Sequence, residues 1–101
     1  MNIRIGWEFH ENPSRATFHC DRLLPSISWY AKEKDTEDAK KLRGAIESIN
    51  GIEEVATWKY RLSVKRGGVF SWSELCPVVE EKILEFLGCE NVERVSIKYG
   101  M

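Results

Sequence analysis

The sequence has no long apolar run and no excess of charge of one sign. No stretch approaches the roughly 20 apolar residues that a helix needs to cross a bilayer. The chain begins with alternating apolar and polar side chains, unlike a signal peptide. Fifteen Lys and Arg residues oppose sixteen Asp and Glu residues, so the net charge is −1. We therefore expect a cytoplasmic protein with no membrane partner and no bulk positive field that attracts nucleic acid.

Cysteine and histidine are also scarce. The sequence holds three cysteines and two histidines, with no C-x-x-C pair: Cys20, Cys76, Cys89, His10 and His19. This pattern matches neither a zinc-finger ligand set nor a disulfide framework. Neighbouring residues of a strand point to opposite faces, so His19 and Cys20 could hardly converge on one metal ion. We predict reduced thiols and no metal or cofactor bound by the chain itself.

Catalytic motifs are missing as well. The sequence contains no G-x-S-x-G nucleophile elbow, no phosphate-binding loop and no paired-carboxylate motif. The acidic residues Glu80, Glu81 and Glu85 are expected to face solvent on the outer side of a helix. We predict that the protein is not an enzyme.

What is present fits one small domain spanning residues 1–101, with 43% hydrophobic and 31% charged residues. Residues 3–9 and 15–21 alternate apolar and polar side chains, which predicts two strands joined as a hairpin by the turn at residues 11–14. In the second strand Cys20 falls in step with the inward-facing Ala16 and Phe18. Residues 22–34 fit no regular element and are expected to fold back over the sheet.

The rest of the sequence predicts two helices and three strands. Asp35 or Thr36 can cap a first helix that ends at Asn50-Gly51, and residues 54–60 and 61–66 predict two further strands. Ser71 and Glu74 have capping-box spacing, but a proline at position 77 would then lie inside the helix, so we expect the second helix to begin near Ser73 or later. It ends at Gly88, where Cys89 is expected to be the most exposed thiol. Residues 92–99 predict a last strand with Val95, Ile97 and Tyr99 on its apolar side.

The order of these elements is ββαββαβ, and each helix has a single apolar face. The predicted fold class is therefore α+β: a two-layer sandwich in which both helices cover one face of a mainly antiparallel sheet. The opposite face is predicted to be open to water or a partner. Its expected residues are Arg4, Glu8, Thr17, His19, Arg94, Ser96 and Lys98.

Several short motifs occur in a characteristic order. These are Asn12-Pro13 before a strand that ends in Thr17-Phe18, Ile49-Asn50-Gly51-Ile52 with Val55, Leu62-Ser63-Val64, and Trp72, Leu75 and Pro77 at a helix start. In this order they resemble the N-terminal domain of Nfu/NifU-type iron–sulfur scaffold proteins, over residues 12–87. The resemblance implies a non-catalytic accessory role in iron–sulfur cluster assembly or delivery, with assembly or recipient proteins as partners.

The chain departs from that family in ways that affect the expected role. In the family a C-x-x-C motif in a separate C-terminal domain holds the cluster, and this motif is absent here. An iron–sulfur cluster is therefore expected only through a partner. Glu11 stands where the family has a first proline, Thr17 stands where it usually has lysine, and residues 88–101 are an extra segment.

For a protein partner, the expected surface combines the hairpin turn with neighbouring aromatic and arginine side chains, which dominate interface energetics. The candidate partner-binding residues are Asn12, Pro13, Arg15, Trp58, Tyr60 and Arg61. Two structural alternatives stay open, because Asn-Pro also forms turns and Trp58 could fill the core. Trp7 and Trp72 are assigned to the core, whereas Trp29 and Tyr30 are either a lid on the core or an exposed anchor.

A second class of function is binding of single-stranded nucleic acid by the region of residues 58–66. Four cations lie there beside two aromatic residues, an arrangement that can pair with phosphates and stack on bases: Lys59, Arg61, Lys65, Arg66, Trp58 and Tyr60. The net charge and the lack of an RNA-recognition motif argue against it, and a solvated strand face is the simpler interpretation.

Overall fold

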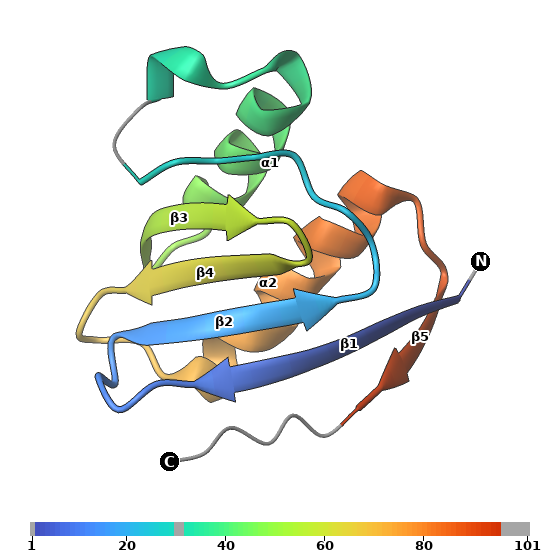
Figure 1. The fold of residues 1–101 in the computed structure, drawn as a ribbon. Coiled ribbons are helices and arrows are strands. Elements are labelled where there is room, and N and C mark those ends of the chain that lie inside the picture. Colours follow the sequence, from blue (N-terminus) through green and yellow to red (C-terminus); the bar gives the residue numbers. More distant parts are fainter. Residues whose placement is uncertain (1, 30–31, 96–101) are drawn as a thin grey trace.

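Five strands form one sheet in the order β3-β4-β2-β1-β5, and two helices cover one of its faces (Figure 1). The computed structural model describes residues 2–29 and 32–95. The elements in chain order are β1 (Asn2–Phe9), β2 (Arg15–Cys20), the short helix η1 (Lys32–Lys34), α1 (Glu37–Glu47), β3 (Ile52–Trp58), β4 (Arg61–Arg66), α2 (Trp72–Leu87) and β5 (Asn91–Arg94). Neighbouring strands are antiparallel except β1 and β5, which are parallel. The predicted α+β sandwich with the order ββαββαβ is confirmed.

The core lies between the helices and one face of the sheet. Alternate residues of the strands point to this side, as the period-two pattern predicts. Phe18 is completely buried at the centre, and Trp7 meets it edge to face with ring centroids 5.3 Å apart. From the helices the core receives Leu42, Ile46, Val79 and Ile83. None of the helices within residues 2–29 and 32–95 combines the length and the apolar character needed to cross a bilayer.

The two helix starts differ from each other. Thr36 caps α1, and its hydroxyl accepts a hydrogen bond from the amide of Ala39 at 3.2 Å. The helix α2 begins at Trp72, one residue before the predicted start near Ser73, and Ser71 takes the N-cap position that the prediction had excluded. Pro77 is the sixth residue of α2 and cannot donate to the carbonyl of Ser73, but Ser73 is exposed, so water can reach that carbonyl. Ser71 and Glu74 have capping-box spacing, but the Ser71 side chain makes no cap hydrogen bond.

Residues 22–29 lie along the outer edge of β3 (Figure 1). The amide of Thr57 donates to the carbonyl of Ile27 at 2.9 Å, and the amide of Leu24 donates to the carbonyl of Lys59 at 2.8 Å. Leu24 and Ile27 enter the core. The segment therefore covers a free strand edge, and only its end reaches toward the open face of the sheet.

The last strand has the opposite phase to the predicted one. Val92 pairs with Ile3 and Arg94 with Ile5, so both face the helices, and Val95 is 42% exposed. The Arg94 guanidinium donates to Glu80 at 2.7 Å. Two predictions are therefore wrong: Arg94 is not on the open face, and Glu80 does not face solvent. Positions 96–99 lie outside the described residues.

Candidate interaction surface

The uncovered face of the sheet carries a hollow of about 720 Å³. Its floor includes Thr17 of β2, Ser63 of β4 and Ala56 of β3, which lie side by side in the register of the sheet. Trp29, at the end of the edge segment, and Trp58, at the end of β3, both line it. Trp58 is 66% exposed, so it does not fill the core. As predicted, Arg4, Glu8, Thr17 and His19 lie on the uncovered face, although Thr17 is itself buried among its neighbours.

A chain of hydrogen bonds holds the polar floor of the hollow. Nε2 of His10 lies 2.7 Å from Oγ1 of Thr17, which in turn lies 3.0 Å from Oγ of Ser63. Beside it, Nε2 of His19 lies 2.9 Å from a carboxylate oxygen of Glu8. Thr17 is buried and its hydroxyl is satisfied. The floor is therefore polar, and its side chains are joined by hydrogen bonds.

Each indole lies next to an arginine. The Arg15 guanidinium carbon stands 5.1 Å from the Trp29 ring centroid, and Arg61 is the direct cross-strand partner of Trp58. Among residues 2–29 and 32–95, neither Arg15 nor Arg61 forms an ion pair. Two arginines free to meet anions thus flank the hollow.

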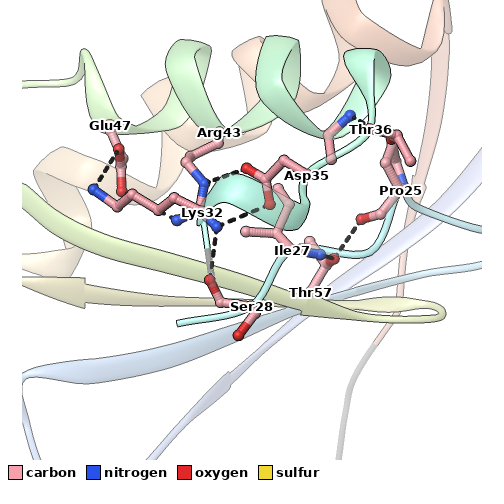
Figure 2. A network of polar contacts seen from close by, with 10 residues as sticks. Pro25, Ile27, Ser28, Lys32, Asp35, Thr36, Arg43, Glu47 and Thr57 are labelled. Carbon is pink, nitrogen blue, oxygen red and sulfur yellow. Dashed lines mark hydrogen bonds and ion pairs between the residues drawn. The ribbon is translucent and has the colours of Figure 1, made fainter. Parts of the chain in front are cut away.

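A buried ion pair positions the segment that carries Trp29 (Figure 2). Arg43 of α1 donates to both carboxylate oxygens of Asp35, at 2.6 and 3.2 Å, and to the carbonyl of Ser28 at 2.7 Å. On the β3 side, the Thr57 hydroxyl donates to the Pro25 carbonyl and accepts from the Ile27 amide. Arg43 and Thr57 therefore fix the chain immediately before Trp29 from two directions.

This ion pair gives the stability of the protein a pH dependence. The hydrogen bond from Arg43 lowers the pKa of Asp35 below its ordinary value of 3.8. A lowered folded-state pKa means that the stabilisation is complete above about pH 5 and is lost as the pH falls through the folded value. We expect urea unfolding to show a large stability difference between the wild type and Asp35→Asn at neutral pH, and a small one at low pH. A difference independent of pH would contradict this assignment.

The predicted site residues at the hairpin turn serve the turn itself. The Asn12 side chain accepts hydrogen bonds from the amide and the hydroxyl of Ser14, at 3.1 and 2.8 Å. The Pro13 carbonyl accepts from the indole of Trp72 at 2.8 Å and from Nε of Arg66 at 2.9 Å. The turn is thereby tied to the start of α2.

The sheet separates the six predicted residues into two groups. In the register of β2 and β4, Arg15 lies opposite Lys65, whereas Arg61 lies opposite His19. Asn12, Pro13 and Arg15 are therefore at one end of the sheet, and Trp58, Tyr60 and Arg61 are at the other. Trp29 links the two, because it contacts Arg15 and lines the same hollow as Trp58. The sequence singled out Trp29 but could not place it, because its segment has no periodic pattern.

The region of residues 58–66 does not form one basic face. The Arg66 guanidinium donates hydrogen bonds to the carbonyls of Pro13 and Phe70. Lys65 lies 3.8 Å from a carboxylate oxygen of Glu53. Lys59 and Arg61 remain beside the indole of Trp58, which Lys59 approaches to 5.7 Å. The proposed surface for single-stranded nucleic acid is thus reduced to the tip of the β3–β4 hairpin.

The thiols lie at the core. Cys76 is buried, and Cys20 and Cys89 are half-buried against the core cluster. Burial, with a smaller contribution from the Glu80 charge, raises the pKa of Cys76 to about 12. Burial also raises the pKa of Cys20. Both shifts favour the protonated thiol, which is a poor nucleophile.

We expect Cys76 to be alkylated slowly. At pH 8 the folded protein should react with iodoacetamide at Cys76 at least about a hundredfold more slowly than the urea-unfolded chain, because so little thiolate is present. Mass spectrometry of the peptide that carries Cys76 measures this ratio, and the unfolded chain is its own control. Equal rates in the two states would show that the thiol is accessible and ionised.

Comparison with known proteins identifies the fold. Scans of known protein families and of curated proteins found no match. Among solved structures, the chain is similar to the solution NMR structure of a NifU-like protein from Saccharomyces cerevisiae, with a TM-score of 0.62 and 13% sequence identity. The match covers 89% of this chain and 82% of that chain. The chain therefore has the fold of a NifU-like protein, and the fold implied by the sequence resemblance is confirmed.

Proposed function

We propose that this chain is a non-catalytic, protein-binding accessory domain that serves iron–sulfur cluster assembly or delivery. The observation that carries the proposal is the hollow on the uncovered sheet face, where Trp29 and Trp58 are available to a partner. Partly exposed tryptophans beside arginines are the side chains that contribute most to protein interfaces. The NifU-like fold and the sequence motifs support the link to iron–sulfur proteins.

In this proposal the cluster belongs to the partner. Among the described residues, no three His, Cys, Asp or Glu side chains lie close enough to hold a metal ion, and Cys76 is buried. A separate C-x-x-C scaffold domain would supply the ligands, as the family resemblance implies. The domain contributes recognition: it binds the scaffold or the recipient through the open face and leaves the chemistry to that protein.

The proposal is tested by calorimetric titration with a C-x-x-C scaffold domain of NifU type, prepared both in the apo form and loaded with its cluster. We expect saturable binding that Trp58→Ala weakens by about tenfold or more, since a central interface tryptophan typically contributes at least that much. Val69→Ala removes another highly exposed apolar side chain, which lies between β4 and α2 and does not line the hollow, and it should leave the affinity unchanged. Absence of binding to either form of the scaffold would contradict the proposed function.

A further inference from the structure

We infer that the partner presents to the hollow an extended acidic segment, in which one aromatic side chain lies between two carboxylates. The inference rests on the proposed function, because it names the chemistry of the partner at the same surface. It follows from the spacing of the two arginines, from the space between the two indoles and from the other charges on this face.

The spacing of the arginines comes from the sheet register. Arg61 pairs with His19, which is four residues beyond Arg15 on the same strand. At about 3.3 Å per residue, the two guanidinium groups originate roughly 13 Å apart along the strand direction. Residues i and i+4 of an extended peptide have the same separation and point to the same side. Two carboxylates at these positions can therefore meet Arg15 and Arg61 together.

The hollow between the arginines suits the residue midway between these carboxylates. In an extended segment, residue i+2 points to the same side as residues i and i+4. It would enter the space lined by Trp29, Trp58 and Ala56, which at about 720 Å³ is large enough for an aromatic ring. The hydroxyls of Thr17 and Ser63 lie beneath it, already joined by their own hydrogen bond. These two hydroxyls therefore keep a hydrogen-bond partner when an apolar ring covers them and excludes water.

The remaining charges favour a peptide over single-stranded nucleic acid. Binding of a polyphosphate chain draws on several cations in a row. On this face Lys65 is already close to Glu53, while the carboxylates of Glu8 and Glu54 would repel a continuous anionic backbone. A segment with only two carboxylates, each placed at an arginine, meets less of that repulsion than a chain of phosphates.

The test uses a capped peptide of sequence Ser-Glu-Thr-Phe-Thr-Glu-Ser, added to the full-length ¹⁵N-labelled chain. We expect the indole N–H signals of Trp29 and Trp58 to shift in a saturable way. The same peptide with both glutamates replaced by glutamine, and a rearranged peptide with the glutamates adjacent, should bind about tenfold more weakly or worse. A short oligothymidylate is titrated in parallel at low and high salt.

Variants of the protein distinguish the contribution of the two arginines to peptide binding from the effect of losing any one positive charge. Arg15→Gln and Arg61→Gln should each weaken peptide binding about tenfold. Lys41→Gln, at an exposed position on α1 away from the open face, is the matched control and should have no effect. The chemical-shift dispersion of the amide signals in the ¹⁵N spectrum of each variant shows whether that variant is folded.

Each outcome decides the inference. Stronger binding of the spaced acidic peptide that is lost in both arginine variants supports it. Equal shifts with the glutamine peptide, no shifts at all, or binding of only the oligothymidylate with steep salt dependence would overturn it. If the scaffold domain binds while the acidic peptide does not, the proposed function stands and this inference fails. If the peptide binds while the scaffold does not, the face recognises acidic segments and the proposed function fails.

Discussion

Replacement of Arg43 by methionine is expected to destabilise the protein more than removal of any exposed charge. The Arg43 and Asp35 side chains are only 8% and 3% exposed, so methionine leaves a buried carboxylate without its counter-charge. The Ser28 carbonyl also loses its donor. We expect the urea concentration at the midpoint of unfolding to decrease by as much as is typical when a buried ion pair loses one partner. We also expect the NMR signal of the Trp29 indole to broaden or shift, because the segment that carries Trp29 loses one of its contacts.

Two comparisons make this result specific. The double variant Asp35→Asn with Arg43→Met removes the orphaned charge and should regain part of the lost stability. Lys41→Met removes an exposed cation from the same helix and should change the free energy of unfolding by no more than about 0.5 kcal/mol. Equal stability of Arg43→Met and Lys41→Met would show that the ion pair contributes nothing to folding.

The substitution Gly51→Ala is expected to cost about 2 to 4 kcal/mol, combining backbone strain and overpacking. Gly51 follows α1 with a φ of +99°, a conformation that a Cβ atom disfavours. A Cβ at this position would also lie 2.7 Å from Cγ of Phe70 and 3.0 Å from a Leu75 methyl carbon. The Phe70 ring would have to move from its packed position. Urea unfolding monitored by tryptophan fluorescence measures the loss.

Two other glycines serve as controls for Gly51. Neither Gly44 nor Gly68 has any heavy atom within 4 Å of an added Cβ. Gly44 lies inside α1, so Gly44→Ala should stabilise the protein by up to about 1 kcal/mol through helix propensity. Gly68→Ala should change stability by less than about 0.5 kcal/mol. If all three variants were equally stable, contact with Phe70 would not explain the requirement for glycine at position 51.

The fold was predictable where the sequence is periodic. Ile3, Ile5 and Trp7 alternate strictly, and Leu42 and Ile46 recur at helical spacing, so the strand or helix type and its inward face follow from the pattern. The phase of β5 was wrong because a four-residue strand at the edge takes its register from β1, and local alternation cannot show this. The start of α2 was predicted one residue too late because the carbonyl that Pro77 leaves without a helical donor belongs to an exposed residue, where water can reach it.

The candidate site was predictable only in part. Trp58 and Arg61 could be identified from the local run of aromatic and basic residues, and their exposure agrees with a role at a surface. The place of Trp29 depends on Arg43, Asp35 and Thr57, which hold an irregular segment against the edge of β3. These are contacts between residues far apart in sequence, and no local pattern encodes them.

The most direct test of the central claim is to map which face of the domain a partner covers. The ¹⁵N spectrum of the full chain is recorded with increasing amounts of the cluster-loaded C-x-x-C scaffold domain. We expect the largest shifts at the indoles of Trp29 and Trp58 and at the amides of Thr17 and Ser63. Shifts confined to the outer surface of α2, around Glu81 and Glu85, would contradict it, since the partner would then bind the helical layer and leave the sheet face free.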